Sequence, residues 1–268
     1  MFAPMKFDIS RLLESWEYKP GQVLVRRFKT KEGGEKIQLR LDLGVLQMNA
    51  EGRPDGKRPL GHESFFHHLV SQLERHRAAH DGSDEEFAIT PEDCARLQQE
   101  AIQYHHRYIC LYQLGDYQAV VRDAERNLEV FDFVDEFAET DELSWALQQF
   151  RPQLLLMLTR ARGMIALDKK EFAATAREVE NGIATIREFY NAFERPELAD
   201  QSGEIASLEQ WLENLRNNHE KREEKPEAEP PQLTERQKLE RALQDAVSRE
   251  DYEQAARVRD ALKNLKTP

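Results

Sequence analysis

Residues 172–193 read FAATAREVENGIATIREFYNAF, and the spacing of apolar side chains in this stretch sets the class of fold. The apolar positions advance by alternate steps of four and three residues, which places them on one face of an α-helix. They are Phe172, Ala176, Val179, Ile183, Ile186, Tyr190 and Phe193. We expect the helix to end at Arg195-Pro196, because the residue before a proline is biased away from helical backbone.

The same helical period extends in both directions from this stretch. Thr90-Pro91 predicts a helix start, since a threonine caps a first turn and proline fits the first helical position. Leu114-Gly115-Asp116 predicts a break between two helices. The apolar positions of the other helices are 94, 97, 101, 104, 108 and 111; 117, 120, 124, 128 and 131; 143, 147, 150, 154, 158 and 161; and 205, 208, 212 and 215. Pro152 lies inside the third of these groups, where the unbroken phase predicts one kinked helix.

Two short phrases in this helical region are alike. Residues 114–119 (LGDYQA) and 167–174 (LDKKEFAA) each end one helix and open another, and their starts are about 53 residues apart. They resemble the turn between the two helices of a tetratricopeptide repeat, whose own period is about 34 residues. The pattern fits either an antiparallel helical bundle or a repeat-like scaffold.

The N-terminal region predicts a short helix at residues 9–16 and a small sheet after it. Residues 22–28 and 37–43 flank Gly33-Gly34, and the second run alternates apolar and polar side chains, which is typical of a β-hairpin. The residues alone leave the register of this hairpin open. Gly44 predicts a bend before a further run at 45–48.

A helix is predicted at residues 62–80, after the turns that contain Gly52-Arg-Pro-Asp-Gly56 and Pro59-Leu-Gly61. Its apolar face carries Phe65, Phe66, Leu69 and Leu73. We expect this helix to back the sheet and to bury the Ile37–Val45 face.

Near the C-terminus, residues 217–232 (NNHEKREEKPEAEPPQ) are rich in charge and proline, and we expect them to form a disordered linker. Residues 235–265 then carry two apolar stripes at helical spacing, separated by a break at 248–250. The stripes consist of Leu239, Leu243 and Ala246, and of Tyr252, Ala255, Ala256, Arg259, Leu262 and Leu265. The spacing predicts a helical hairpin in which the alanine pair lets the two helices approach closely.

At residues 251–260, DYEQAARVRD, the hairpin closely resembles the UVR motif. The core of that motif is an acidic residue, an aromatic residue, a second acidic residue, one variable position and then Ala-Ala-x-x-Arg-Asp. Tyr252 replaces the commoner phenylalanine, and Leu243 stands where methionine is frequent. The motif occurs at the C-terminus of UvrB, within UvrC, and in bacterial partners of Clp ATPases and their zinc-containing adaptors. The resemblance covers residues 233–268.

The resemblance implies association and not catalysis, because in that family the hairpin pairs with another UVR hairpin or with a partner protein. The partner would be a second copy, UvrB, UvrC or a Clp ATPase. An energetic argument also favours association, because a hairpin of this size cannot bury enough apolar surface to form its own core. The residues expected to make contact are Leu239, Leu243, Tyr252, Ala255, Ala256, Val258 and Leu262, with Arg259 and Asp260 fixing the hairpin or pairing across the interface. A linker would also let the hairpin dock on its own body.

Charge is distributed unevenly along the chain. Residues 1–80 carry 14 basic and 10 acidic side chains, residues 81–218 carry 13 and 28, and residues 219–268 carry 11 and 12, which gives net charges of +4, −15 and −1. The acidic middle argues against duplex binding, because phosphate contacts dominate nucleic-acid affinity. Near the N-terminus the chain is locally basic, at Arg26, Arg27, Lys29 and residues 53–58. This region fits either a solvated loop or a patch that weakly binds an anion or nucleic acid.

No motif for catalysis or for a cofactor stands out, since GxxxxGK[ST], CxxC and HExxH are all absent from the sequence. Cys94 and Cys110 are expected on one helix about 24 Å apart, which is too far for a disulfide. The chain has no apolar run of membrane-spanning length. Its first residues lack the apolar core of a secretion signal, so we expect a cytoplasmic protein.

Three further groups of side chains have alternative interpretations. His76 and His80 have a spacing that can bind a metal, and His62, His67 and His68 lie in the same predicted helix. Solvated or packing histidines are the favoured interpretation there, and polar packing in the core or at an interface is favoured at His105-His106. An acidic cluster accompanies Phe131, Phe133 and Phe137, and would recruit a partner, hold a divalent cation or form a solvated helix end. Its members are Asp132, Asp135, Glu136, Glu139, Asp141 and Glu142.

The sequence therefore predicts an α+β fold that is mostly helical. We expect a sheet-and-helix unit at 1–88, a helical domain at 89–216, a linker at 217–232 and a hairpin at 233–268. The leading hypothesis is a non-catalytic bacterial adaptor without a cofactor or metal. One alternative is an accessory factor of nucleotide excision repair. The other is an enzyme with a site between the N-terminal unit and the helices, around Arg53, Asp55, His62 and Glu63.

Overall fold

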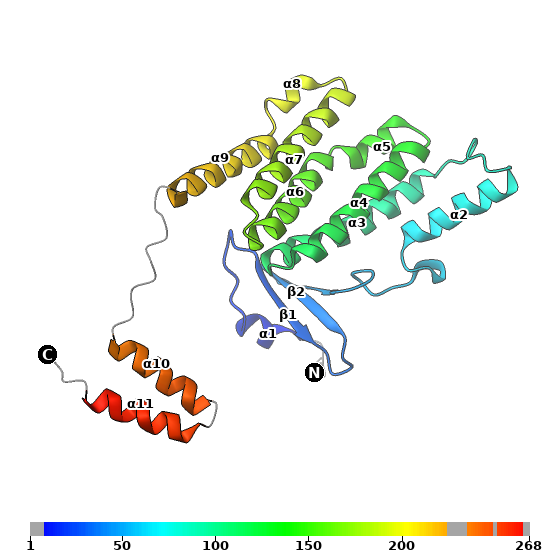
Figure 1. Ribbon diagram of the computed structural model, residues 1–268. Coiled ribbons are helices and arrows are strands. Elements are labelled where there is room, and N and C mark those ends of the chain that lie inside the picture. Colours follow the sequence, from blue (N-terminus) through cyan, green and yellow to red (C-terminus); the bar gives the residue numbers. More distant parts are fainter. Residues whose placement is uncertain (1–7, 224–234, 249–250, 265–268) are drawn as a thin grey trace, which may run out of the picture. The chain divides into compact units, whose positions relative to one another are not determined.

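The computed structural model describes residues 8–223, 235–248 and 251–264, and it confirms an α+β fold that is mostly helical (Figure 1). The chain divides into two units, at residues 1–215 and 216–268. The first unit contains a three-stranded sheet followed by the helices of the main body, and the second contains the C-terminal hairpin.

The sheet is antiparallel, and its strands follow one another in chain order. The strands are β1 (Leu24–Lys29), β2 (Glu35–Leu41) and β3 (Gly44–Asn49), and α1 (Ser10–Glu14) precedes them. The register that the sequence left open pairs Arg27 with Ile37. Thr30 N donates to Gly34 O at 2.7 Å, and Gly33 has a φ of +86°, so this glycine supplies the left-handed turn. The bend expected at Gly44 begins the third strand.

The two faces of the sheet are covered by different parts of the chain. Helix α3 (Pro91–Gln113) packs on β2, and Ile37 is fully buried. On the polar face, Arg40 Nε donates to the carbonyl of Trp16 at 2.7 Å, and the guanidinium of Arg26 lies 4.2 Å from the centre of the Trp16 ring. The segment around α1 therefore covers polar side chains that would otherwise face water, and Gln38 and Arg40 are buried.

The expectation that the whole Ile37–Val45 face is buried is wrong at one end of the sheet. Leu41 is 41% exposed and Leu43 is 89% exposed. Both lie at the β2–β3 turn, whereas the opposite end of the sheet, where β3 finishes at Asn49, is the end held by the helices. The alternating pattern predicts the strand correctly, but it cannot show how far the covering helix extends.

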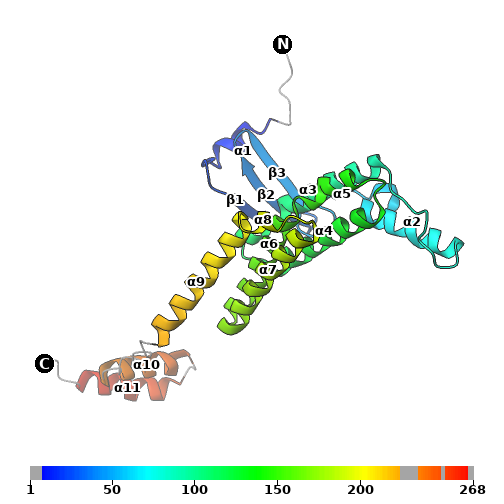
Figure 2. The ribbon, with the colours of Figure 1, turned by 90° about the horizontal axis from the view of Figure 1, so that it is seen from above.

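Helix α2 (Phe65–Ala79) begins where Ser64 Oγ accepts a hydrogen bond from His67 N at 3.1 Å. Its buried face is the predicted one, Phe65, Phe66, Leu69 and Leu73. The expectation that this helix backs the sheet is wrong, because α3 packs there and α2 lies at the far end of the body from the strands (Figure 2). Phe66 instead meets Phe133 of α4 edge to face, with ring centres 5.5 Å apart.

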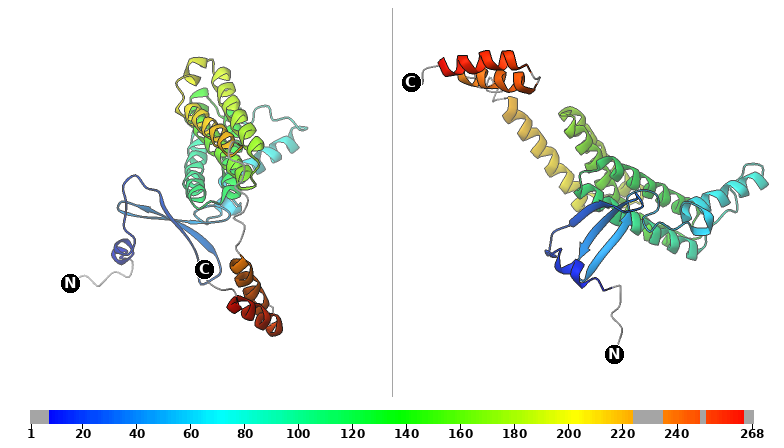
Figure 3. Two further views of the ribbon diagram at one scale, coloured as in Figure 1. Left: turned by 60° about the vertical axis from the view of Figure 1, so that its left-hand side comes forward. Right: turned by 90° about the horizontal axis from the view of Figure 1, so that it is seen from below.

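The main body is built of helices, several of which are long and pack side by side (Figure 3). Its helices are α3 (Pro91–Gln113), α4 (Tyr117–Phe137), α5 (Asp141–Gln148), α6 (Arg151–Asp168), α7 (Phe172–Ala192), α8 (Pro196–Ala199) and α9 (Gly203–Glu223), and a 3-10 turn at Pro59–Gly61 precedes α2. Helix α3 begins with the predicted cap, in which Thr90 and Asp93 each accept from the other's backbone. All six of its predicted apolar positions are buried.

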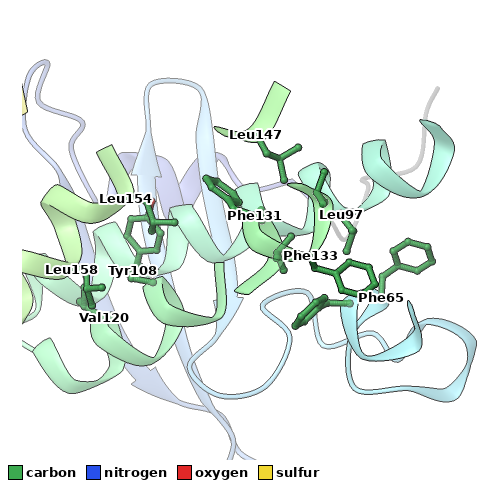
Figure 4. Close-up of a cluster of buried hydrophobic side chains, with 14 of the residues drawn as sticks. Phe65, Leu97, Tyr108, Val120, Phe131, Phe133, Leu147, Leu154 and Leu158 are labelled. Carbon is green, nitrogen blue, oxygen red and sulfur yellow. The ribbon is translucent and has the colours of Figure 1, made fainter. Parts of the chain in front are cut away.

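Two apolar cores stabilise this body. The larger core joins Ile37 of the sheet to α2, α3, α4, α5 and α6, and Figure 4 shows part of it. The smaller core lies between α6, α7 and α9 and contains Val179, Ile186 and Leu208. Of the stripe that predicted α7, Val179 and Ile186 are buried, and the other five residues are half-buried.

The two similar phrases, 114–119 and 167–174, form turns with the same hydrogen-bond pattern. Asp116 N donates to Leu111 O and Glu171 N donates to Ala166 O, both at 3.0 Å. The residue before each donor has a positive φ, +75° at Gly115 and +63° at Lys170. This pattern is a common way to end a helix and to satisfy its last carbonyls.

The expectation of one kinked helix across Pro152 is wrong. Helix α5 ends at Gln148 and α6 begins at Arg151, so Pro152 lies in the first turn of a new helix. Proline is stable there because the first-turn N–H groups have no partner within the helix. The apolar phase continues across the break because Leu147 and Leu154 enter the same core.

Part of the predicted linker is helical. Helix α9 runs to Glu223, so residues 217–223 continue the helix, while 224–232 lie outside the described residues. Glutamate, lysine and arginine are good helix formers and can extend a helix that is already nucleated.

Helices α6 and α7 are in close contact at Gly182. A Cβ atom at this position would lie 2.2 Å from Thr159 Oγ1. Alanine usually stabilises a helix relative to glycine by up to about 1 kcal/mol. Here we expect Gly182→Ala to lower the free energy of unfolding by about 1–3 kcal/mol, because the added methyl group overpacks the contact. Chemical denaturation of the full chain measures this.

The matched control is the same substitution in a Thr159→Ala background, which removes Oγ1 and Cγ2, the two nearest of the three Thr159 atoms that the new methyl group would meet. The destabilisation by Gly182→Ala should then shrink or reverse. A cost that is equal in both backgrounds would contradict the proposed contact.

Candidate functional site

The C-terminal hairpin consists of α10 (Glu235–Ser248) and α11 (Tyr252–Asn264), which pack against each other. Asp251 N donates to Ala246 O at 2.9 Å, which satisfies a carbonyl at the end of α10. The Asp251 carboxylate accepts from Gln254 N at 3.0 Å and so caps the start of α11. The first acidic residue of the quoted motif therefore has a structural role in the hairpin.

Burial within the hairpin is shallow. Among its described side chains, the buried apolar ones are Ala246 and Ala255, at 3% and 8% exposure. Two alanines leave little side-chain volume between the helices, so the backbones can approach closely. The remaining predicted contact residues on the stripes are half-buried: Leu239, Leu243, Ala256, Val258 and Leu262.

Arg259 and Asp260 are exposed, and they pair with each other. Arg259 Nη2 lies 3.0 Å from Asp260 Oδ1, and the two side chains are 57% and 60% exposed. This pair between adjacent residues leaves both charges at the surface of α11. The side chain of Tyr252, which is one of the predicted contact residues, lies outside the described residues.

Two apolar positions of α10 were in neither the predicted stripe nor the predicted contact residues. Ala242 is half-buried, and Val247 is 53% exposed. Both belong to the full amphipathic series 239, 242, 243, 246 and 247, so the helical period contained the information. An exposed valine beside the buried Ala246 widens the apolar stripe of α10.

A comparison with protein families identifies this hairpin. Residues 234–267 match the model described as UvrB/uvrC motif, which confirms the resemblance to the UVR domain. This motif is a protein-interaction module in UvrB and UvrC, and it indicates a role in protein–protein or DNA-repair-related interaction. No curated protein and no solved structure matches the chain. The tetratricopeptide-like resemblance of the helical middle stays a prediction.

In the main body, a buried ion pair joins α3, α4 and the loop after β3. Arg107 and Asp123 are each 1% exposed, and Arg107 Nε and Nη2 donate to the two carboxylate oxygens at 2.6 and 2.8 Å. Arg107 Nη1 also donates to the carbonyls of Asn49 and Gly52, at 3.1 and 2.6 Å. This arginine therefore holds the end of the sheet against the helices.

Glu100 forms a second buried ionic centre beside the first. Its carboxylate is fully buried and accepts from the backbone N–H groups of Phe65 and Phe66, at 2.8 and 3.3 Å. Arg126 donates to the same carboxylate, and Arg53 Nε lies 2.9 Å from it. A carboxylate at a helix N-terminus is favourable because the unpaired N–H groups carry partial positive charge. Glu100 thus fixes the start of α2.

The residues of the enzyme hypothesis are only partly brought together. Arg53 pairs with Asp55 at 3.4 Å and lines a cavity of about 340 Å³, which is also lined by Phe65, Arg96, Pro59, Leu60 and Gln99. His62 instead lies edge to face with His68, with ring centres 5.1 Å apart. Among the described residues this cavity lining supplies two arginines and no carboxylate, so it contains no acid–base pair.

The histidines of α2 have partners within the chain. His67 Nδ1 lies 2.7 Å from Ser64 Oγ, and His76 Nε2 lies 2.9 Å from the carbonyl of Glu85. The rings of His76 and His80 are stacked, with centres 4.1 Å apart. Within the described part of the chain, no group of three or more histidine, cysteine or carboxylate side chains could hold a metal ion.

Several side chains of the predicted charged patches are paired internally. Arg27 Nη2 lies 2.6 Å from Asp116 Oδ2, and Asp132 pairs with Arg151. The phenylalanines of the acidic cluster, at positions 131, 133 and 137, are buried. The acidic cluster therefore presents carboxylates at the surface and keeps its aromatic rings in the core.

Both cysteines are free thiols buried on α3, as the sequence predicts. Burial raises the pKa of the Cys94 thiol, and it raises the pKa of Cys110 to about 12. Both thiols are therefore protonated at neutral pH, a state that disfavours nucleophilic reaction. Within the described residues no helix is long and apolar enough to cross a membrane.

The Arg107–Asp123 pair gives a test of the main body. We expect Asp123→Asn to lower the free energy of unfolding by about 3–5 kcal/mol, because it leaves a buried guanidinium without its counter-charge. Glu125→Gln is the matched control on the same helix, since the Glu125–Arg162 pair is 45% exposed on both sides. We expect this control to change the free energy of unfolding by less than about 1 kcal/mol. Equal losses in chemical denaturation would contradict the special role of the buried pair.

Proposed function

We propose that this chain is a non-catalytic adaptor of the bacterial cytoplasm whose C-terminal hairpin associates with a second UVR hairpin. The proposal rests on one observation, which is the shallow burial of the apolar stripes of α10 and α11. Leu239, Leu243 and Leu262 are half-buried, and Val247 is more than half exposed. An apolar stripe of this width on a small hairpin is typical of a surface that packs against another protein.

Size supports the same conclusion. A domain of fewer than about 40 residues rarely forms a sufficient core without a disulfide, a metal or a partner. The hairpin contains no cysteine or histidine, so it cannot form a disulfide and lacks the best metal ligands. Pairing of two such hairpins would create a four-helix arrangement that buries both stripes.

The polar faces are consistent with this arrangement. Arg257 Nη2 lies 2.5 Å from Glu253 Oε1, and Arg236 Nε lies 3.1 Å from Glu240 Oε1, so both are exposed pairs one helical turn apart. Such pairs support the helices weakly and keep the outer faces hydrated. We expect association to use the apolar stripes, and the proposed contact residues are the nine predicted above.

A substitution at Ala256 tests the proposal. Ala256 is half-buried on the stripe, and a glutamate there would place an unpaired carboxylate in the proposed interface. Burying an unpaired charge costs several kcal/mol, so we expect Ala256→Glu to weaken association by about 100-fold or more. Sedimentation equilibrium of the full chain measures self-association, and a pull-down with the UVR hairpins of UvrB and UvrC measures association with those partners.

Ala261→Glu is the matched control, because Ala261 lies on the same helix but is exposed. It introduces the same charge and should leave association unchanged. Circular dichroism shows whether both variants keep the helical content of the parent chain. Association that survives Ala256→Glu in a folded protein would refute the proposed interface.

The second candidate function is an accessory role in nucleotide excision repair, and the description of the matched motif favours it. It predicts a complex with UvrB or UvrC that forms through the hairpin. A chain that self-associates and binds neither of these proteins supports the general adaptor. A chain that binds one of them and is displaced by that protein's own UVR hairpin supports the repair role.

A further inference from the structure

The main body contains an apolar cavity whose lining includes none of the residues of the buried ion pair or of the hairpin. Its volume is about 180 Å³, and it lies between α3, α4, α5 and α6. Phe131, Leu147 and Leu154 form its inner wall, and Figure 4 shows them in the core beside Tyr108. A protein cavity of about 150 Å³ with apolar walls is large enough to bind one benzene ring. This cavity is therefore of the size that holds a single six-membered ring.

The mouth of the cavity exposes large apolar side chains. Ile102 and Phe150 both line the cavity, and each is 48% exposed. Exposed large apolar side chains that gather at one concave place mark a binding site more often than isolated ones do. An apolar ligand would cover both of these side chains.

The lining is uncharged, although a third of the residues in the chain are charged. Its polar members are Gln98, His105, Tyr108, Asn127 and Gln153. Burial, and to a smaller extent the neighbouring His106, lowers the pKa of His105, which favours its neutral form at pH 7. Such a lining disfavours an ionised ligand, because a charge would lose its hydration and gain no counter-charge.

Tyr108 and His105 form a hydrogen-bonded pair within this lining. Tyr108 Oη lies 2.6 Å from His105 Nδ1. The Tyr108 side chain is only 3% exposed, so this pair lies in the interior of the protein. A neutral histidine and a tyrosine can each donate or accept, so the pair can match a hydroxyl group in either direction.

We propose that this cavity binds a small, neutral aromatic molecule that carries one hydroxyl group. The ring would pack against Phe131, Leu147 and Leu154, and the hydroxyl would hydrogen-bond to the Tyr108–His105 pair. The inference concerns the helical body and is independent of the proposed role of the hairpin.

Three probes that share a single aromatic ring test this proposal at pH 7.5: phenol, toluene and benzoate. Phenol supplies the ring and the hydroxyl, toluene supplies the ring alone, and benzoate adds a negative charge. We expect saturable binding of phenol, about tenfold weaker binding of toluene because one hydrogen bond is lost, and still weaker binding of benzoate. Ligand-detected NMR titration of the full chain, with the shift in Tm as a second readout, measures the dissociation constants.

Variants of α3 locate the site. Ala101 lines the cavity, so Ala101→Leu should fill it and abolish binding of phenol and toluene. Ala95→Leu is the matched control, because Ala95 lies on the same helix and is exposed. Tyr108→Phe keeps the ring and removes the hydroxyl, so it should weaken phenol and leave toluene unchanged. This second variant keeps the test decisive if Ala101→Leu does not fold.

Four results would overturn the proposal. These are no saturable binding of phenol or toluene, benzoate binding as tight as phenol, phenol binding that persists in folded Ala101→Leu, and an equal response of phenol and toluene to Tyr108→Phe.

Discussion

The buried ion pair between Arg107 and Asp123 is the constraint on which the main body depends. A guanidinium that is 1% exposed is stable only when its donors are satisfied, and this one also donates to Asn49 and Gly52 after β3. Separation of the sheet from α3 and α4 would therefore leave the Nη1 donors of Arg107 without acceptors in the core. Glu100 acts in the same way on the first turn of α2, so both N-terminal elements are attached to the helices by charge as well as by apolar contact.

The two units differ in how much of its own apolar surface each one buries. The body closes two cores over its long helices, and its buried positions include residues at 0% exposure such as Leu97 and Val120. The hairpin buries Ala246 and Ala255 among its described residues and leaves its leucines half-covered. This difference supports a division of roles in which the body is a folded scaffold and the hairpin is the surface that associates.

Local patterns predicted local features well. The capping residues at Thr90, the break at Gly115 and the stripe of α7 all depend on neighbours within a few residues. Pro152 was misinterpreted because two helices that enter one core keep the same apolar phase across a short break, and the sequence carries no other sign of it. Leu43 was expected to be buried because alternation gives the face of a strand but not the extent of its cover. The apolar positions of the hairpin were predictable, and Val247 was missed although it follows the same period.

The linear pattern alone established an α+β chain with mostly helices and a UVR motif at residues 234–267, because helical period and short motifs are encoded by neighbouring residues. The partners of Arg107, the carboxylate at the start of α2 and the cavity beside Tyr108 were decided by the tertiary structure. Each of these joins residues from separate elements, and a sequence contains no direct record of which distant side chains share a place in the core. Burial makes these features energetically important, because an ion pair or an unfilled volume has a strong effect only when water is excluded.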